Sequence, residues 1–350
     1  MKAITVEPGT ANTVCLEERP DPVDDKERLL VETIALGICG TDREIIAGGY
    51  GWAPPDGKRL VLGHESLGRV VEAPNGSAFR SGDLVVGIVR RPDPVPCIAC
   101  AAGEWDMCRN GLYTEHGIKS VDGFGAERFR LDPEFAVTVA PELGTLGVLL
   151  EPASVLAKAW DHIERIGGRT QSWAPKTALI TGAGPVGLLA AMMAQQRDLE
   201  VHVFDHNESG PKPELVRALG GIYHTDEPPK DLAADITIEC TGVPELVLDV
   251  MCRGAGAGIV CLTGVSAGGH TLPFDSGRFN RNMVLLNDTV FGSVNANRRH
   301  YEAGARSLAA ADADWLGRLI TRRVPLERWH EAFERHKGDI KVVLMFREHR

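Results

Sequence analysis

The stretch Lys176-Thr-Ala-Leu-Ile-Thr-Gly-Ala-Gly-Pro-Val-Gly187 decides the fold of the second half of this chain. Residues 178–181 read as a short buried strand, and residues 188–195 read as a helix. Between them, Gly182, Gly184 and Gly187 stand at G-x-G-x-x-G spacing. The first glycine permits a tight turn, the second lets the backbone approach a pyrophosphate, and the third lets the helix pack on the strand. Free N–H groups at the helix start would then bind the phosphates of a dinucleotide.

A second strand-like run, residues 200–204, follows this helix and ends in Asp205. An acid at this place accepts hydrogen bonds from the ribose hydroxyls of the adenosine. It would repel a 2′-phosphate, and His206 and Asn207 supply no fixed positive charge. We therefore expect NAD in preference to NADP, unless His206 is protonated or Lys212 or Arg217 reaches the site. The alternative is a glycine turn in another parallel α/β unit. The complete order of strand, glycines, helix, strand and acid favours the dinucleotide site.

The composition restricts the class of protein. With 350 residues, the chain is long enough for two domains with sizeable cores. Its net charge of −10 argues against a nucleic-acid or anionic-membrane partner. The N-terminus alternates like a strand, without the apolar run of a signal peptide, and no apolar run is long enough for a membrane helix. We therefore expect a cytoplasmic protein whose eight cysteines are metal ligands or buried thiols.

Two regions with different patterns indicate the domain organisation. Residues 1–151 contain short β-like runs such as 29–35 and 85–89, separated by glycine and proline turns, which is typical of a β-rich domain. From 152 to 294, strands alternate with helices, which predicts a doubly wound parallel sheet. The expected strands there are 177–181, 200–205, 235–239, 257–263 and 288–292, and the expected helices include 185–197 and 211–219. The tail, 295–350, contains helical stretches and ends in a further strand, 340–346, and we expect it to complete the first domain.

Metal-type side chains occur in the first half of the chain. Cys39 lies in Gly-Ile-Cys-Gly-Thr-Asp, and His64 is followed by Glu65. A thiolate and an imidazole are good zinc ligands, and a carboxylate would serve as the third, leaving one position open for substrate. Taken alone, a cysteine is more often a small buried apolar residue, and a histidine is more often a hydrogen-bonding residue of the core.

A second group consists of Cys97, Cys100 and Cys108. Clustered thiols with C-x2-C spacing in a cytosolic chain indicate a structural zinc site. The alternative is three unpaired thiols buried in a loop. The polar neighbours, such as Glu104 and Arg109, argue against that burial.

These motifs, in this order, resemble the zinc-containing medium-chain dehydrogenases over essentially the whole chain. That family combines a GroES-like β-rich catalytic domain with a Rossmann domain, so the resemblance implies an α/β protein. Its motifs here are Cys39 with Thr41, Gly63-His64-Glu65, the cysteines at 97–108, Glu151-Pro152 and the glycines at 182–187. Within the family, the chain resembles the glucose dehydrogenase branch, through residues 89–91, 103–108, 115–124 and 292–295.

The resemblance implies a role for each matching residue. Cys39 and His64 would ligate a catalytic zinc, and Glu65 and Glu151 would ligate it directly or through water. Thr41 would relay the proton of the substrate hydroxyl. Glu115, Glu151 and Asn295 would bind the sugar. The dinucleotide would lie on Gly182, Gly184, Pro185, Val186, Gly187 and Asp205, with His206 and Asn207 in place of the basic pair of NADP-preferring relatives.

The chain departs from the family at the structural zinc site. Relatives usually present four cysteines there, and this chain presents three. The position of the missing first cysteine falls near Asp93-Pro94, and proline cannot ligate a metal. Asp93 is a candidate fourth ligand, because zinc accepts carboxylate oxygen. The alternative is a weak or empty site.

The implied activity is oxidation of the anomeric hydroxyl of an aldose to the lactone, with hydride transfer to NAD. Rival activities within the family are oxidation of a polyol, of threonine or of a simple alcohol. A rival from another class is a zinc-free NAD-binding protein that is not an enzyme. We also expect a homo-oligomer, a dimer or a tetramer, because the apolar strand 288–292 is a candidate edge for pairing across a two-fold axis.

Overall fold

The computed structural model describes residues 1–226, 232–269 and 271–347. The chain divides into two compact units. One unit contains Met1–Ser154 together with the described residues from Asn295 onward, and the other contains Val155–Val294. The first boundary lies within helix α3 (Leu150–Gly167).

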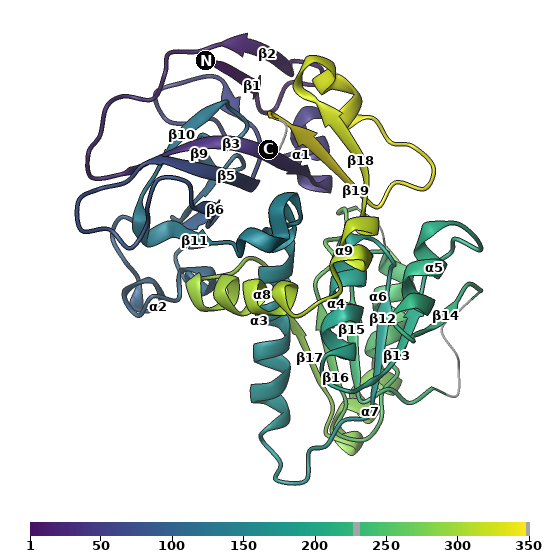
Figure 1. Cartoon of the computed structure of the whole chain (residues 1–350). Coiled ribbons are helices and arrows are strands. Elements are labelled where there is room, and N and C mark those ends of the chain that lie inside the picture. The colour runs from purple at the N-terminus through teal and green to yellow at the C-terminus, as the bar shows by residue number, and fades with distance from the viewer. Residues whose placement is uncertain (227–231, 270, 348–350) are drawn as a thin grey trace. The chain divides into compact units, whose positions relative to one another are not determined.

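The unit Val155–Val294 is built around a six-stranded parallel sheet in the order β14-β13-β12-β15-β16-β17. Its elements are β12 (Thr177–Thr181), α4 (Pro185–Gln195), β13 (Glu200–Phe204), α5 (Pro211–Ala218), β14 (Ile222–His224), β15 (Ile236–Glu239), α6 (Pro244–Met251), β16 (Ile259–Leu262), α7 (Ser276–Leu286) and β17 (Thr289–Gly292). The strand order reverses at β12, as in doubly wound dinucleotide-binding sheets. Figure 1 shows helices α4 to α7 around this sheet. The predicted fold class is confirmed.

The predicted strands of this unit agree with the observed ones to within about two residues. β12 covers the predicted range, and β13, β15, β16 and β17 are each shorter than predicted by one to three residues. The central strands are buried along most of their length, since residues 178–181 of β12 and all four residues of β15 are buried. Both faces of a parallel sheet are covered, which explains this burial.

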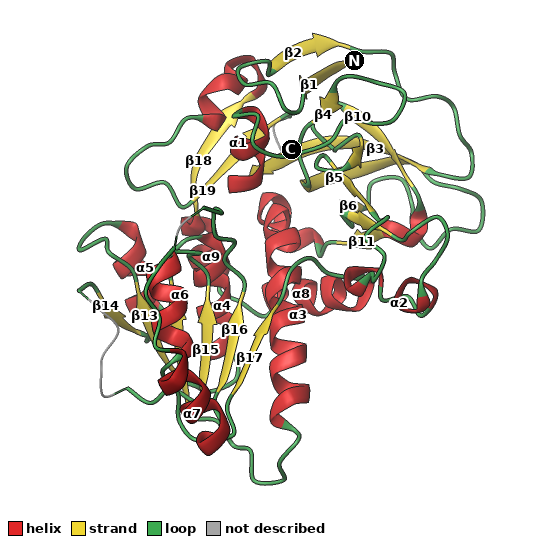
Figure 2. Cartoon of the chain, turned by 180° about the vertical axis from the view of Figure 1, so that it is seen from behind, coloured by secondary structure: helices red, strands yellow, loops and turns green. Residues whose placement is uncertain are grey.

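The other unit is β-rich, as Figure 2 shows by its yellow strands. Its elements are β1 (Lys2–Val6), β2 (Cys15–Glu18), β3 (Leu29–Ile38), α1 (Gly40–Ile46), β4 (Leu60–Val61), β5 (Glu65–Glu72), β6 (Leu84–Gly87), β7 (Arg90–Arg91), α2 (Ile98–Ala101), β8 (Thr114–His116), β9 (Ser120–Val121), β10 (Arg128–Leu131), β11 (Ala136–Thr138), α8 (Arg298–Ala309), α9 (Ala313–Leu319), β18 (Ile320–Pro325) and β19 (Lys341–Met345). Short 3-10 turns cover Trp105–Met107, Pro133–Phe135, Pro141–Leu149 and Leu326–Phe333.

Strand β3 is the centre of the larger sheet in this unit. The order is β11-β6-β5-β3-β19-β18, and β10 also pairs with β3. Because β19 lies antiparallel to β3, with Val342 opposite Ile38, the end of the chain completes the sheet that the N-terminal half begins. A smaller sheet, β7-β8-β9, lies in the same unit and pairs Arg90 with Glu115.

Candidate active site

The first cluster of metal-type side chains lies where β3 ends and β5 begins. The ligand atoms of Cys39, His64 and Glu65 are all within 4.8 Å of one another. Cys39 follows β3 and is the N-cap residue of α1, while Glu65 starts β5 opposite Gly37. A side chain at position 37 would collide with the Glu65 carboxylate, so this position requires glycine. A thiolate, an imidazole and a carboxylate in this arrangement fit a zinc ion with an open position.

Asp42, for which the sequence analysis predicted no role, holds this cluster in place. It is fully buried, and its Oδ2 accepts a hydrogen bond from the Cys39 backbone N–H at 2.8 Å. Its Oδ1 faces Nδ1 of His64 at 3.4 Å. Burial lowers the pKa of the His64 imidazole, but the negative charges of Asp42 and Cys39 outweigh it and keep that pKa well above its usual range. An imidazole whose Nδ1 faces a carboxylate has its Nε2 available for a metal.

Lys341, from strand β19, is the second missed residue of the cluster. Its Nζ lies 2.7 Å from Oε1 and 2.6 Å from Oε2 of Glu65, and both side chains are buried. Burial lowers the lysine pKa, but the charge of Glu65 outweighs it, so the pKa is raised. The pair is therefore a buried salt bridge that holds the Glu65 carboxylate beside the cluster.

Glu151 and Thr41 lie near this cluster but are not among its three residues. Desolvation raises the pKa of Glu151 to about 7, and the neighbouring charge of Glu65 adds to that effect. Thr41 Oγ1 is 3.9 Å from the Cys39 sulfur. These two residues thus share the surroundings of the cluster, and their predicted roles remain predictions.

The three loop cysteines form a second cluster. The sulfurs of Cys97, Cys100 and Cys108 lie within 4.8 Å of one another. The Arg109 backbone N–H donates to the Cys97 sulfur at 3.4 Å, and this bond and that from Cys100 lower the pKa of Cys97 to about 6. Backbone donors to sulfur favour the thiolate that a zinc site needs. The set therefore fits a structural metal with three sulfur ligands.

Asp93 does not belong to this group of sulfurs, so its assignment as fourth ligand remains a prediction. Its Oδ1 accepts a hydrogen bond from the Val95 N–H at 2.9 Å. Its Oδ2 is buried and has no hydrogen-bond partner within the described part of the chain. A buried carboxylate oxygen without a partner is costly, and a cation would remove that cost.

A third cluster joins two residues predicted to bind sugar, Glu115 and Asn295, with Arg90. Oε1 of Glu115 accepts three hydrogen bonds. Two come from the Arg90 guanidinium, from Nε at 3.0 Å and Nη2 at 2.9 Å, and one comes from Asn295 Nδ2 at 2.7 Å. All three side chains are buried. Oε2 of Glu115 has no hydrogen-bond partner among residues 1–226, 232–269 and 271–347. This oxygen is therefore available to accept a hydrogen bond from a ligand hydroxyl.

The glycine turn of the other unit has the geometry of a dinucleotide site. Gly182 has φ +89°, and a side chain at Gly187 would collide with the Gly182 carbonyl, so both positions require glycine. Helix α4 begins at Pro185, with no side chain capping its first turn, so its N–H groups can bind phosphate. A cavity of about 650 Å³ beside the turn is lined by residues such as Phe204, Asp205 and Leu246.

Asp205 is tightly held in this cavity. Its Oδ2 accepts from the Ala183 N–H at 2.8 Å and from Lys212 Nζ at 2.9 Å, and its Oδ1 accepts from the backbone and the side chain of Asn207. Burial raises the pKa of this carboxyl, but these donors outweigh it, so the pKa is lowered and the group stays ionised. Nδ1 of His206 lies 3.7 Å from Oδ1 of Asp205, and the His206 side chain is 88% exposed.

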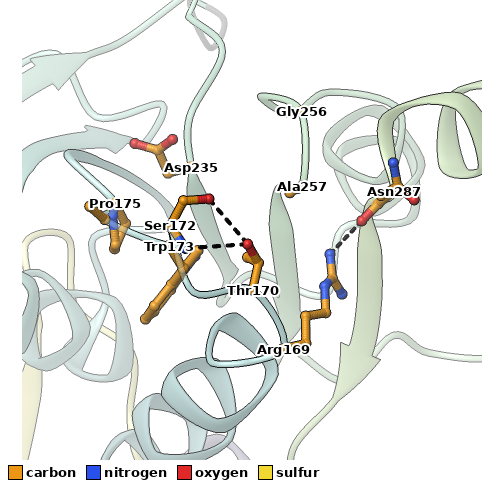
Figure 3. Close-up of a pocket in the computed structure, with 10 residues that line it drawn as sticks. Arg169, Thr170, Ser172, Trp173, Pro175, Asp235, Gly256, Ala257 and Asn287 are labelled. Atoms are coloured by element: carbon orange, nitrogen blue, oxygen red, sulfur yellow. Dashed lines mark hydrogen bonds between the residues drawn. The ribbon is translucent and has the colours of Figure 1, made fainter.

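A further cavity of about 640 Å³ lies at the opposite edge of the parallel sheet, before the strands begin (Figure 3). Polar groups that line it are bonded to one another or to neighbouring residues. The Arg169 guanidinium donates to Asn287 and Thr289, and Asp235 accepts from the Thr177 N–H and hydroxyl at 3.0 Å. Ligands of open parallel sheets bind at the carboxyl ends of the strands, so this cavity is not the candidate site.

Among the described residues, none of the helices has the length and apolar character needed to span a bilayer.

Comparison with known proteins gives matches over the whole chain. Residues 144–346 match the family model of the glucose dehydrogenase C-terminus, and residues 25–141 match that of the alcohol dehydrogenase GroES-like domain. The chain is 39% identical over 351 residues to glucose 1-dehydrogenase 1 of Caldivirga maquilingensis, with 98% of each chain covered. It is 40% identical over 352 residues to glucose 1-dehydrogenase of Thermoproteus tenax, with 98% of this chain and 99% of that one covered.

Among solved structures, glucose dehydrogenase of Haloferax mediterranei in complex with NADP, Zn and gluconolactone has a TM-score of 0.92 to this chain. The two sequences are 31% identical, and the match covers 99% of this chain and 100% of that one.

Proposed function

Because the chain belongs to the glucose dehydrogenase branch of the zinc-containing medium-chain dehydrogenases, we propose that it oxidises an aldose, glucose above all, to the lactone. The observation that carries this proposal is the open Oε2 of Glu115. The other oxygen of the same buried carboxylate is saturated by Arg90 and Asn295, which fixes the direction of the free one. A polyhydroxylated substrate needs such fixed acceptors, whereas a simple alcohol would leave them without partners.

In the proposed reaction, one set of residues binds the metal and another binds the sugar. Cys39 and His64, with the carboxylate of Glu65 or Glu151, hold the metal, and Asp42 keeps the His64 ring in one orientation. When bound, zinc lowers the pKa of the sugar hydroxyl as a Lewis acid, and the dinucleotide accepts the hydride. Thr41 carries the hydroxyl proton away from the sugar. Glu115, Arg90 and Asn295 bind the other hydroxyls and so orient the ring.

We further propose that NAD is preferred over NADP. A 2′-phosphate would approach the ionised Asp205 carboxylate, and Lys212, the nearest cation, is already bonded to that carboxylate at 2.9 Å. The glucose dehydrogenase of Haloferax mediterranei was solved with NADP, so the preference rests on Asp205 of this chain and not on that relative.

A homo-oligomer joined through the dinucleotide-binding unit is also proposed. Strand β17 is the last strand of its sheet, and helix α7 buries none of its residues. Val284 and Leu285 on this helix are 65% and 63% exposed. An unpaired edge beside exposed apolar side chains favours pairing with a second copy. Sedimentation of a monomer at micromolar concentration would contradict this arrangement.

The protein is proposed to work in a reducing compartment, the cytoplasm. Thiols such as Cys39 and Cys97 bind metal only while they remain unoxidised, and all eight cysteines are free.

The test of the activity is NADH formation with aldoses, polyols and simple alcohols, each with NAD and NADP, before and after treatment with a chelator. Chelator-sensitive oxidation of glucose with NAD is the expected result. Activity on polyols or alcohols alone would contradict the sugar assignment, while absence of zinc from the purified protein would favour a dinucleotide-binding protein that is not an enzyme.

A further inference from the structure

Two aromatic side chains are exposed on the loop that follows helix α1. Tyr50 and Trp52 are 41% and 49% exposed, with their ring centroids 5.1 Å apart and their planes at 74°. This edge-to-face contact leaves ring surface open to solvent. Exposed apolar groups that lie together mark binding sites more often than solitary ones do.

The backbone beneath these rings is fixed. Gly51 has φ +96°, and a side chain there would press on Ile45, so the chain turns tightly against the helix. The Trp52 N–H donates to the Ile118 carbonyl at 2.9 Å, and the Trp52 carbonyl accepts from the Ser120 N–H at 3.0 Å. The aromatic rings therefore project from a preorganised surface and not from a free loop.

The same backbone contacts join the aromatic pair to the Glu115 cluster. Trp52 forms a parallel bridge with Lys119, and the Lys119 N–H donates to the Glu115 carbonyl at 2.8 Å. Trp52 thus extends the small sheet that pairs Glu115 with Arg90. With neighbouring strands about 4.8 Å apart, Trp52 lies about 10 Å from the strand of Glu115.

Tyr113 contacts both a member of the Glu115 cluster and the residue that bridges to Trp52. The Arg90 guanidinium carbon lies 3.7 Å from the centroid of the Tyr113 ring, and Lys119 Nζ lies 4.1 Å from it. Burial raises the pKa of the Tyr50 hydroxyl, and the charge of Glu115 adds to this shift, which agrees with their proximity.

Helix α1 also sets the separation from the metal-type cluster. It begins next to Cys39 and covers seven residues, and Tyr50 follows shortly after its end. At 1.5 Å per residue, the helix spans about 10 Å. One short helix therefore connects the aromatic pair to Cys39 of the metal-type cluster.

We propose that Tyr50 and Trp52 form an aromatic platform for the second ring of a disaccharide whose reducing end is oxidised at C1. The inference rests on the proposed function and extends its substrate class. One face of a pyranose ring presents C–H groups, which are attracted to the negative face of an aromatic ring. The reducing ring would bind to the polar cluster of Glu115, Arg90 and Asn295, and the apolar face of the next ring would pack on the platform.

The chemistry at C1 is the same as for the monosaccharide. The C1–H bond breaks and its hydride, with both electrons, passes to NAD. The anomeric O–H bond breaks, its proton goes to solvent, and the C1–O bond becomes the lactone carbonyl. The glycosidic bond to the second ring stays intact.

The test compares kcat/KM for glucose with that for 1,4-linked and 1,6-linked glucose disaccharides, in the metal-loaded full chain with NAD. The variants are Trp52→Ala, Trp52→Phe and, as a control, Val23→Ala, which removes an apolar side chain that is 84% exposed in the same unit. We expect oxidation of at least one disaccharide. Trp52→Ala should lower the ratio of disaccharide to glucose kcat/KM about five- to tenfold, mainly through KM. Trp52→Phe should restore most of this ratio, and Val23→Ala should leave it as in the parent protein.

The possible failures are distinguishable. If glucose itself is not oxidised, the proposed function fails. If glucose is oxidised but no disaccharide is, or if Trp52→Ala lowers both rates equally, the platform is not a sugar subsite. A lower sedimentation mass in Trp52→Ala with an unchanged ratio would make these rings part of a subunit contact and would also overturn the inference.

Discussion

Both carboxylate oxygens of Glu65 lie within hydrogen-bond distance of the Lys341 ammonium, at 2.7 and 2.6 Å, although the residues are 276 positions apart in the chain. The carboxylate of a candidate metal ligand is therefore shared between a lysine and the metal position. This relationship links the stability of the β-rich unit to metal binding.

Lys341→Met leaves Glu65 buried without its cation. An unpaired buried charge costs about 3–5 kcal/mol, so the free energy of unfolding of the metal-free protein should fall by about that amount. Added zinc should recover part of the loss, because Glu65 can then pair with the metal. Urea unfolding with and without zinc measures both effects, and Lys341→Arg, which keeps the charge, is the control. An equal loss in both conditions would separate Glu65 from the metal site.

Asp42→Asn replaces the carboxylate whose Oδ1 lies 3.4 Å from Nδ1 of His64 by a neutral amide. Loss of such an outer partner typically lowers metal affinity 10- to 100-fold, and we expect a decrease of that size. Competition with a chromophoric chelator measures the affinity, and circular dichroism checks that the fold is kept. Unchanged zinc affinity in a folded variant would show that Asp42 only caps helix α1.

Asp205→Ser removes the negative charge that faces the ribose position. We expect the ratio of kcat/KM for NAD to that for NADP to fall about tenfold or more, because the like-charge repulsion of the 2′-phosphate is lost and Lys212 is released. Steady-state kinetics with both dinucleotides measures this ratio. A parent protein that already prefers NADP, or a ratio that does not change, would contradict the role given to Asp205.

Cys100→Ser removes the buried member of the loop cluster. We expect the zinc content to fall by about one ion per chain, with loss of thermal stability, because structural zinc sites contribute directly to folding. Elemental analysis and thermal unfolding measure the two effects. Cys252→Ser, a partly buried cysteine outside both clusters, should keep the full zinc content. Equal zinc contents in the two variants would mean that the three-cysteine site does not bind zinc.

His116 predicts a dependence of stability on pH. Burial, with a smaller effect from Arg91, lowers its pKa to about 3, so the folded protein keeps a neutral imidazole. In the unfolded chain this imidazole takes up a proton below about pH 6.5. The contribution of His116 to the free energy of unfolding is therefore fully present above that pH and decreases as the pH falls towards 3. The slope from this residue is about 1.4 kcal/mol per pH unit.

Urea unfolding between pH 7 and pH 5 measures that slope. His116→Gln should flatten it, whereas His330→Gln, at an exposed histidine, should leave it unchanged. The same slope in the parent and His116→Gln proteins would show that His116 accepts a proton in the folded state.

Features that depend on neighbouring residues could be predicted from the sequence. The turn from Gly182 to Gly187 was recognisable because its three glycines, its strand and its helix are contiguous, and each glycine answers a local backbone requirement. Strand β14 (Ile222–His224) was missed, because three residues are too few to show a period.

The sequence by itself determined the two-part architecture, the dinucleotide turn and the identity of the metal-type residues, since each depends on local pattern or short spacing. Only the tertiary structure decided that Lys341 pairs with Glu65, that Arg90 saturates one oxygen of Glu115, and that Trp52 extends the sheet of Glu115. The physical reason is that these contacts depend on which strands pair and in which register. A shift of one residue in β19 would turn Lys341 to the other face of its sheet, and no local pattern fixes that register.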